Sequence, residues 1–418
     1  MTSATTVLPR HERLIRAWMP ELDSLRGVAI LLVLFLHGFA HLVDPASFTG
    51  IQWFFVTATS YGWIGVHLFF VLSGLLITGI LLDSRSRPGY YRRFYTRRAL
   101  RILPAYYALL LLLGLLSRSS WLAGHHVGIP FVLFSVIYLS NLTPLFGIPI
   151  QYTVLWSLAV EEHFYLVWPA IVRRVSVRSL AFVALAVFVS APVVRLVSLQ
   201  LGSVVDENFY TWCNADGLAL GALLSVVLRG SRIPRSVLWG VSGVAAILSA
   251  VTLAWGARLG TLAWTSASGF ALRLTILNIG LAGLVVITLL LGTSPAKGLV
   301  NLRALRFLGE ISYGLYLIHM LFFYEYDRLA RRLWPSLIAS NGKFGNTALQ
   351  FLCAASASIG VAALSRRYFE EYFLRLKDRL AEPKASPPDA RTSSPQFETE
   401  MLPFLDLSHA ATSGGDSE

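Results

Sequence analysis

The stretch ELDSLRGVAILLVLFLH, residues 21–37, decides the fold of this chain. It opens with charged side chains, including Asp23 and Arg26, and continues as an apolar run that ends at His37. Arg26 and His37 are eleven positions apart, so on an α-helix they lie within about 20° of the same face and about 16 Å apart along the axis. Ionisable groups inside a bilayer are costly and usually functional. The stretch therefore predicts a membrane-spanning helix that carries the chemistry of the protein.

The composition also indicates a membrane protein. Of 418 residues, 55% are hydrophobic and only 14% are charged, whereas soluble domains carry about 25% charged residues. Apolar runs of about 18 to 22 residues recur along the chain, and each is long enough to cross a bilayer as a helix. We predict an all-α, polytopic transmembrane helix bundle of about ten spans. The spans lie near residues 27–43, 63–82, 102–116, 153–172, 180–200, 213–228, 236–255, 271–292, 309–324 and 346–365.

Arginine clusters in alternate connections predict the orientation. They follow the second, fourth, sixth, eighth and tenth spans, so the positive-inside rule places these clusters and both termini in the cytoplasm. This distribution explains the net charge of +12, and no nucleic-acid partner is expected. The N-terminus lacks a signal-peptide pattern, so the first helix is expected to remain in a multi-pass protein of the cell (inner or plasma) membrane. Arg328, Arg331 and Arg332 violate the rule, in the connection before the tenth span.

Three regions are predicted: a cytoplasmic N-terminal segment (1–20), a transmembrane domain (21–370) and a cytoplasmic tail (371–418). The tail is expected to be mostly disordered because, from about Glu382, it is rich in Pro, Ser, Thr, Asp and Gly. Residues 129–146 are apolar, but prolines and a glycine interrupt them. A full span there would invert every later connection, so we predict a re-entrant or interfacial segment.

His37 is the predicted general base, because a neutral imidazole accepts a hydroxyl proton near neutral pH. The simpler alternative is a packing residue that hydrogen-bonds a backbone carbonyl. Asp23 and Arg26 lie near the same stripe, which favours a functional site. His41, one turn further on, is predicted to be interfacial.

The fourth predicted span carries two adjacent carboxylates and a histidine, Glu161, Glu162 and His163. Glu161 shares one helix face with Ser157, Tyr165 and Trp168, whereas Glu162 and His163 are predicted to point elsewhere. Glu161 is predicted to orient His37 or a substrate hydroxyl. A buried Glu–Arg pair that only orients helices is the alternative.

Arg98 and Arg101 are three positions apart at the entry to the third span, and they can face one partner together. Guanidinium groups match phosphate geometry, so a phosphorylated cofactor would fit them. Orientation of the protein in the membrane is the alternative explanation for these arginines. In the second span, Ser73 and Gly74 allow close helix packing or close approach of an extended ligand, and His67 is predicted to be interfacial.

Ser312, Tyr316 and His319 share a face of the ninth span. A tyrosine alone would be explained by its usual place at the membrane interface, but the serine and the histidine on the same face indicate a polar face. The two cysteines, Cys213 and Cys353, show neither metal-ligand spacing nor a disulfide framework, so no metal is predicted.

Together these segments resemble the acyltransferase-3 family of integral-membrane acyltransferases, over about residues 20–370. Five blocks carry the resemblance: the Arg26-to-His37 spacing, GVHLFFVLSGLLIT, RRALRILP, WSLAVEEHFYLVWP and LGEISYGLYLIH. The resemblance implies transfer of acyl groups from acyl-CoA to hydroxyls of glycans, lipids or antibiotics, with no permanently bound cofactor. The sequence departs from the family pattern at Asn214, where many relatives have a basic residue. Some relatives carry a fused esterase-like domain, and no second catalytic step is expected here.

The resemblance also implies roles for the residues found above. His37 is the essential base, Arg26 its functional companion and Glu161 a functional carboxylate, while Arg98 and Arg101 lie on the donor side. Ser73, Tyr316 and His319 have further roles, which include structural ones.

The resulting hypothesis is an enzyme in which acyl-CoA enters from the cytoplasm with its phosphates near Arg98 and Arg101. An acceptor hydroxyl, on a glycan, a glycolipid or a small metabolite, loses its proton to His37 and attacks the thioester. Direct transfer and an acyl-histidine intermediate both fit, and a homo-oligomer is left open. This hypothesis would fail if the His37 ring faced lipid and no cavity joined it to the arginines.

The main alternative is a proton-coupled transporter or flippase that uses the buried His and Glu residues, although the two halves of the chain show no repeat. A membrane scaffold is a third alternative, but it leaves the polar helices unexplained.

Overall fold

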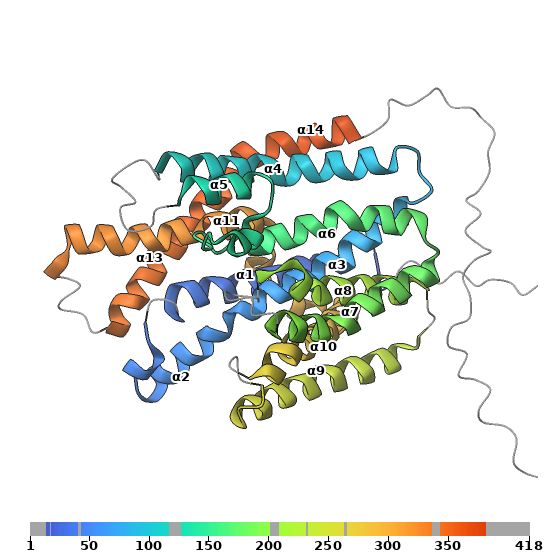
Figure 1. Ribbon diagram of the computed structural model, residues 1–418, viewed down its shortest axis with the longest axis horizontal. Helices are drawn as coiled ribbons and strands as arrows, with labels where there is room; N and C mark the ends of the chain where they lie inside the picture. The colour runs from blue at the N-terminus through green and yellow to red at the C-terminus, as the bar shows by residue number, and fades with distance from the viewer. Residues whose placement is uncertain are drawn as a thin grey trace, which may run out of the picture.

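The computed structural model describes residues 14–16, 18–40, 43–116, 127–200, 209–230, 233–262, 266–336 and 343–381. Within these ranges the regular elements are all helices (Figure 1). The ten long ones are α1 (Pro20–Phe35), α3 (Ile64–Ser84), α4 (Tyr90–Leu116), α6 (Leu155–Arg174), α7 (Val177–Gln200), α8 (Thr211–Gly230), α9 (Arg235–Arg258), α10 (Ala267–Gly292), α11 (Arg303–Leu333) and α13 (Lys343–Leu364). Shorter helices join or extend them: α2 (Gly50–Thr59), α5 (Ile129–Val136) and α14 (Glu371–Ala381), with π-helical turns at Leu36–Ala40 and Ser365–Glu370.

Each of the ten predicted spans overlaps one of these long helices, so the prediction of an all-α, multi-pass membrane protein is confirmed. In the part of the chain that the structure describes, nine helical segments are long and apolar enough to cross a membrane. The long helix outside this set is α6, where Glu161, Glu162 and His163 lower the hydropathy. The span count of ten and the cytoplasmic position of the termini stay predictions.

Residues 129–146 form two short helices, α5 and the 3₁₀ helix Ser140–Phe146. The eight residues of α5 extend only about 12 Å, too short for a span of about 30 Å. At the other end, α14 continues from α13 and packs against α4, so helical structure extends eleven residues past the predicted boundary at 370. Residues 382–418, predicted to be disordered, lie outside the described residues, as does His41.

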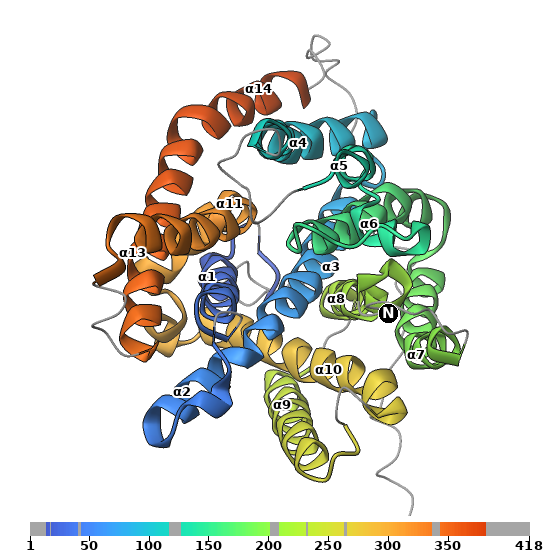
Figure 2. The same ribbon diagram turned by 60° about the vertical axis from the view of Figure 1, so that its left-hand side comes forward.

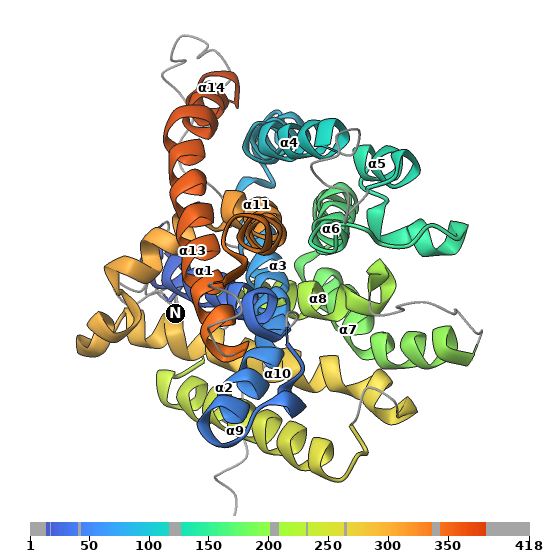
Figure 3. The same ribbon diagram turned by 90° about the vertical axis from the view of Figure 1, so that its left-hand side faces the viewer.

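Helices α1 and α3 lie at the centre of the bundle (Figure 2). Helix α1 contacts α3, α10 and α11, and α3 contacts α6, α8 and α10. The α1–α11 crossing is tight because it is built on two glycines: a Cβ on Gly27 would collide with the carbonyl of Leu305, and one on Gly309 with that of Asp23. Small residues allow such approach between membrane helices. The crossing brings α1 and α11 together along the face that carries their polar side chains (Figure 3 gives the view along the bundle).

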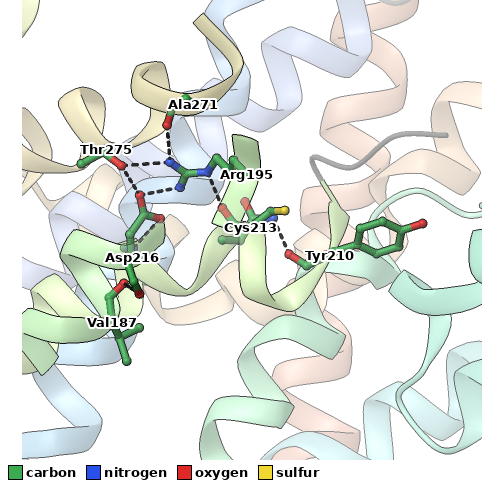
Figure 4. Close-up of polar contacts among 10 residues, drawn as sticks. Val187, Arg195, Tyr210, Cys213, Asp216, Ala271 and Thr275 are labelled. Atoms are coloured by element: carbon green, nitrogen blue, oxygen red, sulfur yellow. Dashed lines mark hydrogen bonds and ion pairs between the residues drawn. The ribbon is translucent and has the colours of Figure 1, made fainter. Parts of the chain in front are cut away.

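A buried ion pair joins α7, α8 and α10 (Figure 4). Arg195 and Asp216 are both fully buried and 2.5 Å apart. Arg195 Nε also donates to the carbonyl of Cys213 at 2.8 Å, and Nη1 donates to the Ala271 carbonyl and the Thr275 hydroxyl at 2.9 Å each. Thr275 donates to the carboxylate in turn, at 2.8 Å. The guanidinium is therefore neutralised and hydrogen-bonded on several sides, which a charge in the interior of a bundle requires.

We expect Asp216→Asn to destabilise the fold strongly, because it leaves the Arg195 charge buried without its partner. Removing one member of a buried pair costs about 3–5 kcal/mol. The control is Asp83→Asn, which breaks the pair with Arg229; Asp83 is 65% exposed, and such pairs are worth less than about 1 kcal/mol. Unfolding in mixed detergent micelles measures both variants. If both variants lost the same amount of unfolding free energy, the buried pair would contribute no more to stability than the exposed one.

Candidate active site

A cavity of about 350 Å³ lies between α1, α3, α4, α6 and α11. Most of the residues that the sequence predicts for a site line it: Asp23, Arg26, Ser73, Arg98, Arg101, Ser157, Glu161 and Tyr316. They come from five helices that are far apart in the sequence, so the fold brings the predicted donor-side residues and Glu161 together. His37, His319 and Gly74 are outside this lining.

The cavity follows one face of α3. Its α3 residues include Val66, Phe69, Ser73, Ile77 and Ile80, which are spaced three or four positions apart. This spacing keeps them on one side of the helix, and the face extends about 21 Å along the axis. The cavity is therefore elongated, with apolar walls between its polar groups.

Glu161 occupies the middle of the cavity wall. Ser73 Oγ donates to Glu161 Oε1 at 2.8 Å, and the Tyr165 hydroxyl donates to Oε2 at 2.9 Å. The Tyr165 hydroxyl also lies 3.1 Å from Ser73 Oγ. Both carboxylate oxygens thus have hydrogen-bond donors, from α3 and from the next turn of α6.

Three arginines reach the same cavity, in different states. Arg26 lies 3.7 Å from Asp23 and donates to Ser312 Oγ at 3.1 Å. Arg101 is exposed. Arg98 lies with its guanidinium carbon 4.0 Å from the centre of the Tyr165 ring, and its buried Nε has no hydrogen-bond partner among the described residues. The cavity thus offers cationic groups that the protein does not fully neutralise.

Ser157 and Tyr316 meet across the cavity. Their hydroxyl oxygens are 2.6 Å apart, which links α6 to α11. The Tyr316 ring also contacts Phe69 of α3, with ring centres 6.3 Å apart. On its other side, the Tyr316 ring centre is 5.8 Å from that of His319. Tyr316 is therefore the cavity residue nearest to the histidines described next.

His37 and His319 form a buried pair. His37 lies in the π-helical turn that follows α1, a rare form often found at functional sites. Its Nδ1 is 3.0 Å from the Val33 carbonyl oxygen and 3.2 Å from Nε2 of His319. His319 Nδ1 in turn is 3.1 Å from the Leu315 carbonyl oxygen.

These contacts assign the protons of the two rings. A carbonyl oxygen only accepts, so the ring nitrogen that faces it carries the hydrogen. Nδ1 of His319 is then a donor and its Nε2 an acceptor, while Nδ1 of His37 is a donor. In the neutral state, the lone pair of His37 is on Nε2.

Two predictions concern the surroundings of His37. Glu161 was predicted to orient His37 or a substrate hydroxyl; it bonds Ser73 and Tyr165, whereas Nδ1 of His37 contacts the Val33 carbonyl and His319. A cavity was predicted to join His37 to the arginines, but the cavity that holds the arginines includes Tyr316 and not His37 in its lining. The reason is the position of His37 on α1, several turns beyond Arg26 and next to α11 rather than α6.

Gly74 was predicted to allow either close helix packing or close approach of a ligand. It packs against α8, where a Cβ would collide with the Leu218 carbonyl, and it is outside the cavity lining. Glu162 was predicted to point elsewhere, yet it lines the cavity beside Glu161. The cavity is wide enough at α6 to receive two adjacent positions. His67 was predicted to be interfacial and is instead buried against Trp63 and Phe70. Within the described ranges, no cluster of His, Cys, Asp or Glu could hold a metal ion.

Comparison with known proteins gives the family. A family model described as an acyltransferase domain matches residues 19–367. The chain is 26% identical over 340 residues to the peptidoglycan O-acetyltransferase OatA of Listeria monocytogenes, an alignment that covers 75% of this chain and 50% of that protein. It is 28% identical over 337 residues to the putative peptidoglycan O-acetyltransferase YrhL of Bacillus subtilis, covering 74% of this chain and 49% of that protein.

A putative O-acetyltransferase of Staphylococcus aureus is 31% identical over 170 residues, 37% of this chain and 24% of that protein. The chain thus spans about half the length, or less, of these curated relatives. No solved structure matches it. The family match covers nearly all of the helical bundle, including every residue that lines the cavity. The chain therefore belongs to the acyltransferase-3 family of integral-membrane acyltransferases.

Proposed function

We propose that this protein transfers a short acyl group, acetyl in the first instance, from acyl-CoA to a hydroxyl of a cell-envelope glycan. The names of the relatives make peptidoglycan the first acceptor to test. The observation that carries the proposal is the elongated cavity, which combines three arginines, three carboxylates and apolar walls inside an acyltransferase bundle.

The donor is proposed to bind by its phosphates at the arginine-lined end. Arg101 is exposed and Arg98 forms no ion pair with the described residues, so both are suited to bind phosphate oxygens. The flexible arm of the donor would lie along the apolar face of α3. Its thioester would then point towards Ser157 and Tyr316, the wall nearest to the histidines.

The reaction is proposed to use His37 as general base. Its Nε2 takes the proton of the acceptor hydroxyl while the hydroxyl oxygen attacks the thioester carbonyl carbon. The carbon–sulfur bond breaks as the new carbon–oxygen bond forms, and the coenzyme A thiolate leaves and takes up a proton. Because His37 lies beyond the cavity wall, the acyl group has to pass Tyr316 to reach it.

We expect Arg98→Ala and Arg101→Ala to raise the KM for acetyl-CoA by about 10- to 100-fold each, with a smaller change in kcat. Hydrogen bonds to charged groups contribute about 1.5–3 kcal/mol, which corresponds to such factors. Arg97→Ala is the matched control, because Arg97 is exposed and outside the cavity lining. Initial rates at varied acetyl-CoA concentration measure the effect. An unchanged KM in the first two variants would remove the donor site.

We expect His37→Ala to lower the transfer rate about 10²- to 10⁴-fold while the protein stays folded, because general-base catalysis contributes factors of this size. The assay uses purified protein in proteoliposomes, radiolabelled acetyl-CoA and peptidoglycan fragments, with O-acetylated product identified by mass spectrometry. His163→Gln is the control, since His163 bonds Thr211 outside the cavity. Full transfer by a folded His37→Ala variant would exclude this mechanism.

We expect His319→Ala to lower kcat about tenfold with little change in the KM for the donor. The variant removes the acceptor for Nδ1–H of His37, a contact worth about 0.5–1.5 kcal/mol. His319→Gln should retain most of the activity, because its side-chain carbonyl can accept the same hydrogen bond. Rates measured as a function of pH complete the comparison. Equal losses in the Ala and Gln variants would argue against an orienting role.

A further inference from the structure

Arg98 is an unusual cation for the interior of a membrane bundle. It forms no ion pair and no hydrogen bond with any residue that the structure describes, and its Nε is buried. Arg195 in the same bundle has a carboxylate, a hydroxyl and two carbonyls around it. Glu161 and Glu162 lie near enough for their charges to act on Arg98, but neither forms an ion pair with it. Because buried charges are normally paired at contact distance, an arginine without such a pair beside a cavity indicates that a ligand supplies the contacting anion.

The group that holds Arg98 is the aromatic ring of Tyr165. The guanidinium carbon lies 4.0 Å from the ring centre, well within the range of a cation–π interaction. Tyr165 is itself buried, with 3% of its surface exposed. Its hydroxyl bonds Glu161 at 2.9 Å and lies 3.1 Å from Ser73 Oγ, so the ring is fixed at its far end.

The same hydrogen bonds keep Glu161 away from an ion pair with Arg98. One carboxylate oxygen accepts from Ser73 and the other from Tyr165, and the distance to Arg98 exceeds that of an ion pair. If Glu161 paired with Arg98, an incoming phosphate would have to displace it. The stack on Tyr165 instead leaves the guanidinium N–H groups available.

We propose that Tyr165 is a positioning residue that presents Arg98 to the phosphate groups of the donor, its ring holding the cation while its hydroxyl holds Glu161. This inference rests on the proposed function, because it concerns the same donor site. The ring of Tyr165 contacts Arg98 and its hydroxyl bonds Glu161. Substitutions that remove only the hydroxyl, or the whole ring, can therefore separate the two roles.

The test is the binding of coenzyme A to the full chain in nanodiscs, measured by calorimetry. Tyr165→Phe keeps the ring, and Ser73 still bonds Glu161 and holds it away from Arg98, so the affinity should stay within about twofold of the wild type. Tyr165→Leu removes the ring and should weaken binding about tenfold, as expected for a desolvated cation–π contact. In an Arg98→Ala background the Leu substitution should have no further effect, because the two residues act as one unit.

The matched control is Tyr90→Leu. Tyr90 is buried on α4, the helix of Arg98, and lies against another arginine, Arg173, at 5.4 Å, but it does not line the cavity. Its loss should leave the affinity for coenzyme A unchanged. Thermal melts of all variants identify any that misfold. If Tyr165→Leu does not fold, Tyr165→Met and Arg98→Lys replace it, since Met removes the ring and Lys removes the planar group that stacks on it.

The outcomes separate this inference from the proposed function. If Arg98→Ala weakens binding and Tyr165→Leu does not, the positioning role is overturned and the donor site stands. Equal losses in the Phe and Leu variants would also overturn it, because the ring would then not be the part that matters. If the wild-type protein binds no coenzyme A, the donor assignment and this inference both fail.

Discussion

A charge in the interior of a membrane bundle needs a compensating partner, and this constraint organises the whole structure. The protein meets it in two ways. Arg195 is surrounded by Asp216, a hydroxyl and backbone carbonyls, and it ties three helices together. Arg98 has an aromatic ring in place of an anion and lies beside a cavity. The contrast distinguishes a charge that serves the fold from one that we propose binds a ligand.

The helices and the face that each presents follow from the sequence, because apolar length fixes a span and the 3.6-residue period fixes its faces. This is why Ser73, Arg98, Glu161 and Tyr316 can each be selected as candidates from the sequence, while the resemblance to the family is what groups them. Which helices become neighbours does not follow from periodicity. The pairing of His37 with His319 is therefore visible only in the folded bundle.

Other features were missed for similar physical reasons. Gly74 lacks a side chain where α8 packs against α3. The sequence alone does not tell whether a helix or a ligand approaches a glycine. Arg195 is a single charge in an apolar segment, and its partner Asp216 lies on another helix. Glu162 shows that a wide cavity can receive two adjacent positions of one helix. The family match also favours the acyltransferase over the transporter that the buried His and Glu residues left open.

The crossing at Gly27 and Gly309 has a consequence for the precision of the histidine pair. There, the backbones of α1 and α11 meet directly, with no side chains whose rotamers could alter their separation. The crossing thereby fixes the separation of the two backbones ten residues before His37 on α1 and ten residues before His319 on α11. Substitutions elsewhere in the apolar interior, or a displacement of α4 or α6 that widens the cavity, would leave the imidazole separation nearly constant. Residues that face lipid or substrate can thus be substituted while the distance between the two imidazole rings is maintained.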